Sequence, residues 1–127
     1  MTELQLTTFR GRVAPGKWFV GNYYCHNDGK IHLIYTPNGR AVVDPNTVGI
    51  RVDGIHDKNG KDIFVGDILE ITLPRNLGTL RGKVIYCHGE FVIVDLTKHH
   101  YAVYLWDGDS EVIGNIHDNP ELLENKR

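Results

Sequence analysis

The sequence predicts an all-β protein, in which an N-terminal β-meander precedes an SH3-like barrel and a short C-terminal helix. The first supporting observation is the regular spacing of turn signals, such as Asp-Gly or Asn-Gly at residues 28–29, 38–39 and 59–60. These pairs supply the positive φ values that tight hairpin turns require. The second is that the runs between the turns are rich in β-branched and aromatic residues, whereas no long segment has helical periodicity.

The N-terminal part, residues 1–62, is expected to form the meander. Three of its segments have strand composition and lie between turn signals: residues 18–24, 31–35 and 40–43. Consecutive strands that are joined by short turns usually pair as antiparallel neighbours. We therefore expect these segments to form one antiparallel sheet.

The C-terminal part, residues 63–127, is expected to form the barrel. Four segments have the composition of its strands: residues 68–73, 82–88, 91–96 and 101–106. A corner at Gly66 and Asp67 enters the first of them, and Gly82 lies early in the second. Glycines at such positions are typical of small, tightly curved sheets. A single compact unit is the alternative organisation, because 127 residues is close to the size of one domain.

A short helix is expected near the C-terminus. Asn119 is suited to the N-cap position, Pro120 to the first helical position, and Glu121 to the positive end of the helix dipole. Leu122 and Leu123 would then anchor this helix on the barrel.

Composition and hydropathy indicate in which cellular compartment the protein acts. Hydrophobic residues make up 41% and charged residues 24% of the chain, which is ordinary for a globular protein. No run approaches the roughly 18 apolar residues of a transmembrane helix, and the first ten residues lack the apolar stretch of a signal peptide. We therefore expect a cytoplasmic protein in which Cys25 and Cys87 are free thiols.

Two motifs resemble those of the YopX family of phage and prophage proteins. The first runs from VG at residues 48–49 through GIHDKNGKDIFVGDI at residues 54–68, and the second is EVIGNIHDNPELL at residues 111–123. The resemblance implies a phage or prophage origin and a β-rich fold, but no established activity and no catalytic residues. The residues themselves predict structural roles, with a turn at 57–60 and a corner at Gly66 and Asp67, where short Asp side chains accept backbone N–H groups.

The sequence predicts no metal site and no cofactor. The segment that starts at Asp57 fails as a calcium loop, because Lys61 and Ile68 stand where oxygen ligands are required. The seven histidines show none of the zinc-site spacings, and adjacent Cys and His residues on a strand point to opposite faces.

The sequence also predicts no enzymatic activity. Ser110 is the one serine, and no nucleophile motif surrounds it or either cysteine. The acids Asp107, Asp109 and Glu111 alternate along one segment, but the first two read as a turn.

Binding is therefore the expected activity, through a protein-binding or self-assembling β module. The expected partners are a host or phage protein or a second copy of the chain, with no membrane contact. The alternative is a nucleic-acid-binding barrel, although the net charge of −2 neither requires nor excludes a polyanion. In either case we expect the surface to lie on the barrel, at Arg81, Lys83, Tyr86 and Lys98, where bases and an aromatic ring gather.

Overall fold

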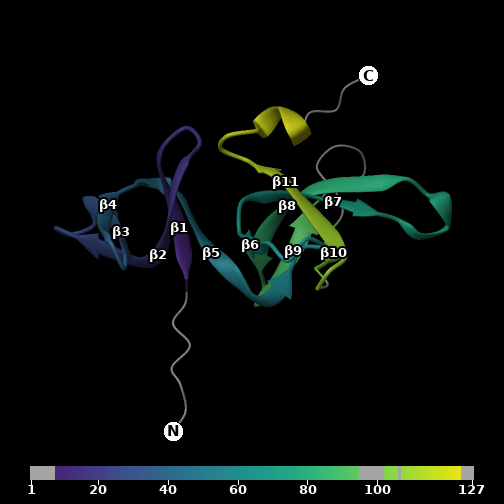
Figure 1. The fold of residues 1–127 in the computed structure, drawn as a ribbon, viewed down its shortest axis with the longest axis horizontal. Helices are drawn as coiled ribbons and strands as arrows, with labels where there is room; N and C mark the ends of the chain where they lie inside the picture. Colours follow the sequence, from purple (N-terminus) through teal and green to yellow (C-terminus); the bar gives the residue numbers. More distant parts are fainter. Residues whose placement is uncertain (1–7, 95–101, 106, 124–127) are drawn as a thin grey trace, which may run out of the picture. The chain divides into compact units, whose positions relative to one another are not determined.

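The computed structural model describes residues 8–94, 102–105 and 107–123. These residues form two antiparallel sheets and short 3-10 turns, which confirms the predicted all-β class (Figure 1). The chain divides into two compact units, residues 1–51 and 52–127. The SH3-like character of the second part and its expected start at residue 63 remain predictions.

The N-terminal unit consists of hairpins joined in sequence order. Its strands are β1 (Phe9–Ala14), β2 (Lys17–His26), β3 (Ile31–Thr36), β4 (Gly39–Val42) and the first part of β5 (Asp44–His56). Their order in the sheet is β4-β3-β2-β1-β5, and β6 follows at the far edge. The three predicted strands of the meander are confirmed as β2, β3 and β4.

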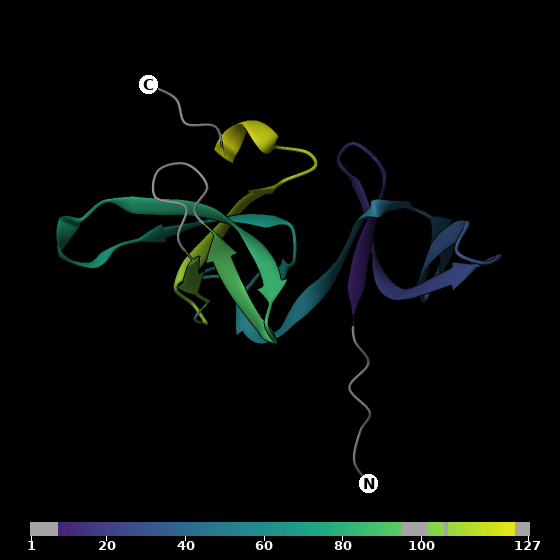
Figure 2. The same ribbon diagram turned by 180° about the vertical axis from the view of Figure 1, so that it is seen from behind.

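The second unit contains the end of β5 and the remaining elements. They are β6 (Asp62–Phe64), β7 (Asp67–Thr72), η1 (Pro74–Asn76), β8 (Thr79–Cys87), β9 (Glu90–Val94), β10 (Ala102–Tyr104), β11 (Ser110–Asn115) and η2 (Pro120–Leu123). Five of them form a sheet in the order β10-β9-β8-β7-β11. Figures 1 and 2 show the tip of the β7–β8 hairpin, which includes η1, extending beyond the other strands of this unit.

In the N-terminal unit, the sequence does not predict strand β1 or the start of β5, whereas a short strand before the turn at residues 57–60 is expected. The start of β5 contains Asp44, Pro45 and Asn46, which are residues typical of turns. It nevertheless pairs with β1, and the register shifts between the Arg10 and Arg12 pairs. Such a bulge admits residues that a regular ladder would exclude, which explains why composition alone missed this strand.

The C-terminal helix is confirmed as the short 3-10 turn η2, which Asn119 precedes as expected. The contacts of Asn119 differ from those of an N-cap side chain. Its carbonyl oxygen accepts the Leu122 N–H at 3.1 Å, whereas its side-chain Oδ1 accepts the Asn115 N–H at 3.2 Å. The side chain therefore ties the turn back to the end of β11.

The core of the second unit is a cluster of buried aliphatic residues from several strands. Its members are Val52, Ile63, Leu69, Val84, Ile93 and Leu105. Gly82 lies opposite Leu69 in the β7–β8 pair. A Cβ atom at Gly82 would lie 2.5 Å from the Val94 carbonyl oxygen and 2.6 Å from Ile93 Cγ2. The close approach of β9 at this point therefore requires glycine.

A buried carboxylate organises the turn between β5 and β6. Asp57 Oδ1 accepts the backbone N–H groups of Asn59 at 2.9 Å and Lys61 at 2.8 Å, and its Oδ2 accepts that of Val112 at 3.1 Å. The Lys58 N–H adds a bond to the Ser110 carbonyl at 2.7 Å. The predicted turn is confirmed, and it is joined to β11, which lies 55 residues further along the chain.

Asp57 is held in its charged form by these bonds. Burial by itself raises the pKa of the carboxyl, since the side chain has little contact with water. The N–H groups of Lys61, Val112 and Asn59, together with the Lys61 charge, outweigh burial and hold the pKa below its ordinary value of 3.8. The carboxylate therefore acts as a structural acceptor at neutral pH.

The corner before β7 and the turn after β11 are built in the same way. Asp67 Oδ2 accepts the Phe64 N–H at 2.8 Å, which confirms the predicted role of this short side chain. After β11, Asn115 Oδ1 accepts the N–H groups of His117 at 3.0 Å and Asp118 at 2.9 Å. The two sequence motifs therefore encode turns that are held by side-chain oxygens.

Replacing Gly82 with alanine is expected to lower the free energy of unfolding by about 2 kcal/mol, because the added methyl overpacks the contact with β9. Urea unfolding measures this change. Thr79→Ala, at an exposed position of the same strand, serves as control and should shift stability by less than about 0.5 kcal/mol. Equal stability of Gly82→Ala and wild type would contradict the close approach.

Replacing Asp57 with asparagine is expected to lower the free energy of unfolding at pH 7 by about 3 kcal/mol. The amide presents one acceptor and one donor to three N–H groups that now share a charged acceptor. The exposed Asp109 provides the control, since Asp109→Asn removes one negative charge without a buried contact. A loss of similar size in both variants would contradict the role of Asp57.

The stabilisation by Asp57 is also expected to depend on pH. Because the folded state lowers its pKa, the unfolded chain binds the proton more readily, so the contribution is complete above 3.8 and is lost as the pH falls through the folded-state value. The difference in unfolding free energy between wild type and Asp57→Asn should therefore shrink below about pH 4. A difference that stays constant between neutral and strongly acidic pH would refute the assignment.

Candidate functional site

The residues expected to form a basic surface on the barrel lie on opposite faces of strand β8. Arg81 and Lys83 alternate with Gly82 and Val84 along β8, whose pairing is regular, so Tyr86 lies on the opposite face from both bases. Arg81 Nε donates to Glu70 Oε2 at 2.8 Å, and Lys83 is half-buried. The structure thus does not bring Tyr86 together with Arg81 and Lys83, and Lys98 lies outside the described residues.

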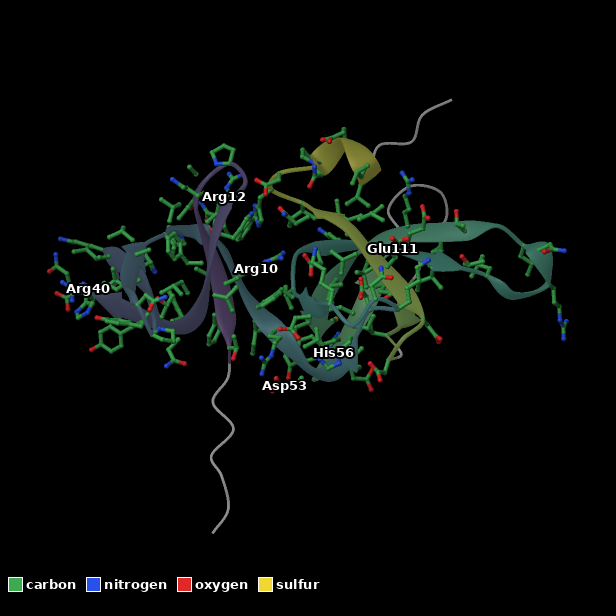
Figure 3. The ribbon with its side chains drawn as sticks, in the orientation of Figure 1. Arg10, Arg12, Arg40, Asp53, His56 and Glu111 are labelled. Carbon is green, nitrogen blue, oxygen red and sulfur yellow. The ribbon has the colours of Figure 1, made fainter. Side chains whose placement is uncertain are left out.

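A histidine between two carboxylates forms a second cluster, at the end of β5. His56 Nε2 lies 3.4 Å from Asp62 Oδ1, and its Nδ1 lies 3.8 Å from Asp107 Oδ1. The Asp107 oxygen also accepts the His56 backbone N–H at 2.7 Å. Figure 3 shows His56 on β5 and Glu111 on β11. Glu111 Oε1 forms an ion pair with Lys58 Nζ at 3.4 Å.

These groups do not assemble a recognisable reaction centre. Ser110 is only 1% exposed, so its hydroxyl is not open to a substrate. Asp107 and Asp109 lie in the turn before β11 and are exposed. Within the part of the chain that the structure describes, no group of three His, Cys, Asp or Glu side chains could hold a metal ion.

A third surface lies on the N-terminal sheet. Residues that pair directly across two strands share a face, and the register pairs Tyr24 with Leu33 and Tyr35 with Arg40. Alternation along β2, β3 and β4 then defines one face, here called the Tyr24 face. Its members are Asn22, Tyr24, His26, Ile31, Leu33, Tyr35, Arg40 and Val42.

The Tyr24 face exposes apolar and aromatic side chains, although its member Leu33 is buried. Tyr24 is 53% exposed, Val42 64% and Ile31 39%. An open depression of about 440 Å³ is lined by four residues of this face, Asn22, Tyr24, His26 and Tyr35, and by Tyr23, whose ring packs on the reverse side. Arg40 is exposed on β4, next to Tyr35, and Figure 3 shows it on this edge strand of the sheet.

The rings around the depression hold one another in place. The Tyr24 ring lies 4.4 Å from that of His26 and 6.4 Å from that of Tyr35, and it is inclined to both by 62° and 79°. His26 Nε2 and the Tyr35 hydroxyl are hydrogen-bonded at 3.2 Å. The aromatic groups of the Tyr24 face are therefore arranged before any ligand binds.

The reverse side of the same strands is packed. The Tyr23 ring stacks on that of His32 at 5.9 Å and contacts that of Phe9 at 5.6 Å. Its hydroxyl bonds to His32 Nδ1, and His32 Nε2 donates to the Gly29 carbonyl at 3.0 Å. Burial, with a smaller effect of Cys25, raises the pKa of Tyr23, so its hydroxyl stays protonated as a donor. This packed side fixes the strands that carry the Tyr24 face.

Sequence reasoning missed this surface because aromatic residues occur at both parities of β2. Phe19 and Tyr23 belong to the packed side, whereas Tyr24 belongs to the open side. One signal was available in the sequence. Asn22 and His26, which lie two residues before and after Tyr24 and therefore on the same side of the strand, are polar. Polar neighbours at every second position indicate a solvent-facing side.

Charge is divided between the two parts of the sequence. Residues 1–51 contain six Lys and Arg against three Asp and Glu, a formal charge of +3. Residues 52–127 contain eight against thirteen, a formal charge of −5. The Tyr24 face itself carries Arg40 and no carboxylate among its eight residues. This face therefore lies on the basic part of the protein.

Comparison with known proteins relates most of the chain to one family. The crystal structure of protein EF1440 from Enterococcus faecalis is similar, with a TM-score of 0.51 and 26% sequence identity over 94% of this chain and 99% of that one. No curated protein matches the sequence. The model of the YopX protein family matches residues 17–124, which include both motifs. The chain therefore belongs to the YopX family.

Proposed function

We propose that this YopX-family protein is a non-enzymatic binding module of phage or prophage origin that acts in the bacterial cytoplasm, and that the Tyr24 face is its contact surface. The observation that carries the proposal is the exposure of Tyr24, Ile31 and Val42 on one sheet face whose reverse side is packed. Apolar exposure gathered on one face marks binding sites on proteins.

The composition of the Tyr24 face supports binding over a merely exposed sheet. Aromatic residues supply much of the energy of binding surfaces, and polar groups beside them fix the orientation of the ligand. Asn22, His26 and the Tyr35 hydroxyl surround the exposed Tyr24 ring in this way. The preorganised rings also reduce the entropy that binding would cost.

The surroundings of the polar clusters support a non-enzymatic function. The one serine is buried, and Asp57 is committed to three backbone N–H groups. No helix among the described residues is long and apolar enough to cross a membrane.

Self-association is the second candidate, and β4 favours it. This strand is at the edge of its sheet, and its residues Gly39, Arg40 and Val42 are exposed. Unpaired edge strands can pair with the same strand of another copy. Light scattering should then give a mass above the 14.4 kDa of one chain, reduced to one chain by Val42→Asp. A monomeric wild type would remove this candidate.

The binding proposal predicts that capture of a ligand depends on Tyr24. Immobilised wild type is exposed to bacterial lysate, with and without nuclease, and the retained material is quantified. Tyr24→Ala should retain at least about tenfold less of the same species, which corresponds to about 1.4 kcal/mol. The loss follows from removal of an exposed ring, not from unfolding, because Tyr24 lies outside the buried core.

Tyr86→Ala is the matched control for this experiment. Tyr86 is 59% exposed, compared with 53% for Tyr24, and it lies on β8 of the second unit. The Tyr86→Ala variant should retain as much of the ligand as wild type does. Equal retention by Tyr24→Ala and wild type would show that the Tyr24 face is not the contact surface.

A further inference from the structure

We infer that the ligand of the Tyr24 face is single-stranded nucleic acid, an inference that rests on the proposed binding function of this face. The geometry combines an exposed ring, polar groups at its edges and a basic side chain at one end. Proteins that bind single strands use the same combination, with bases stacked on aromatic rings and phosphates near cationic side chains.

Tyr24 provides the surface for stacking. Tyr24 is 53% exposed and lines the 440 Å³ depression. The neighbouring His26 and Tyr35 rings are inclined to it, unlike the parallel pair of Tyr23 and His32, whose planes differ by 4°. Because more than half of Tyr24 is exposed, part of its side chain is open to a further flat group such as a nucleobase.

The polar groups around the depression match the edges of bases. The Asn22 amide offers both donors and an acceptor, and the Tyr35 hydroxyl can donate and accept. His26 Nε2 is bonded to that hydroxyl at 3.2 Å, so the two groups are held side by side. Bases that are free of pairing present hydrogen-bonding edges to such groups.

The charge of the face suits a phosphate backbone. Arg40 pairs with Tyr35 across β3 and β4, so the two side chains leave the sheet from directly opposed positions on the same face. Guanidinium groups bind phosphate oxygens through paired N–H donors. None of the eight residues of the Tyr24 face is acidic, and residues 1–51 together carry +3.

A single strand fits these observations better than a duplex or a protein. Bases inside a duplex are stacked on each other, so they cannot reach a ring on a sheet surface. Protein partners usually bury an apolar centre with charge at its rim. Here the depression is lined by aromatic and polar residues, the apolar Ile31 and Val42 are not part of its lining, and the one charged residue of the face is a base.

Fluorescence anisotropy with labelled oligonucleotides tests the inference. The probes are oligo-dT and oligo-U of about 12 nucleotides, with a DNA duplex of equal length for comparison. Wild type should bind both single strands more tightly than the duplex at about 50 mM salt, and binding should weaken steeply by about 200 mM.

Three variants assign this binding to the face. Tyr24→Ala should weaken binding by about 5- to 150-fold, the range measured for loss of one stacked base, whereas Tyr24→Phe keeps the ring and should bind nearly as wild type. Arg40→Ala should reduce the slope of log affinity against log salt by about 0.7. Tyr86→Ala, the matched exposed tyrosine, should leave affinity unchanged.

The outcomes separate this inference from the binding proposal. No measurable binding of either single strand, or equal losses in Tyr24→Ala and Tyr86→Ala, would overturn the inference. Capture from lysate of a protein that survives nuclease and depends on Tyr24 would also overturn it, while the binding function of the face would stand. Thermal unfolding of each variant by circular dichroism confirms that losses of affinity arise in folded protein.

Discussion

The alternation of side chains along β2 is the constraint on which the N-terminal unit depends. This strand pairs with β1 on one side and β3 on the other, so a shift by one residue would exchange its two faces. Tyr23 would then lose its contacts with Phe9 and His32, and Tyr24 would leave the surface. The same register therefore places both the packed side and the Tyr24 face, and the core of this unit specifies where its binding surface lies.

In the second unit, side-chain oxygens hold the turns of the chain in place. Asp57, Asp67 and Asn115 each accept backbone N–H groups at a change of chain direction. Two of them are buried almost completely, and a buried acceptor without donors would cost more than it contributes. The motifs by which the family is recognised are thus explained by turn chemistry. They mark how the chain folds and give no direct information on what it binds.

Much of the fold could be predicted because turns and strands leave local signals. Gly and Asn at the turns, together with the alternation of apolar residues in the segments between the turns, predict the hairpins of β2, β3 and β4. The start of β5 left no such signal, because its pairing with β1 overrides the turn-forming residues Asp44 and Pro45. Strand pairing between distant segments is a tertiary effect that local composition does not contain.

The candidate site was harder to predict than the fold. Arg81 and Tyr86 are near in sequence, yet their odd separation places them on opposite faces of β8. Whether an aromatic ring is buried depends on what packs over it, and Tyr23 and Tyr24 show that adjacent tyrosines can have opposite environments. Sequence gives the parity of each residue, but only the assembled sheet shows which parity faces water.

The bond between Asp57 and Val112 has a consequence for folding during synthesis. It joins residues 55 positions apart, so the turn at Asp57 cannot acquire all its partners until β11 has left the ribosome. The pairs of β1, β2, β3 and β4, by contrast, form between consecutive strands, and the first unit ends at residue 51. The nascent chain can therefore pair the strands around Tyr24 first, while the segment that closes the other unit is still being translated.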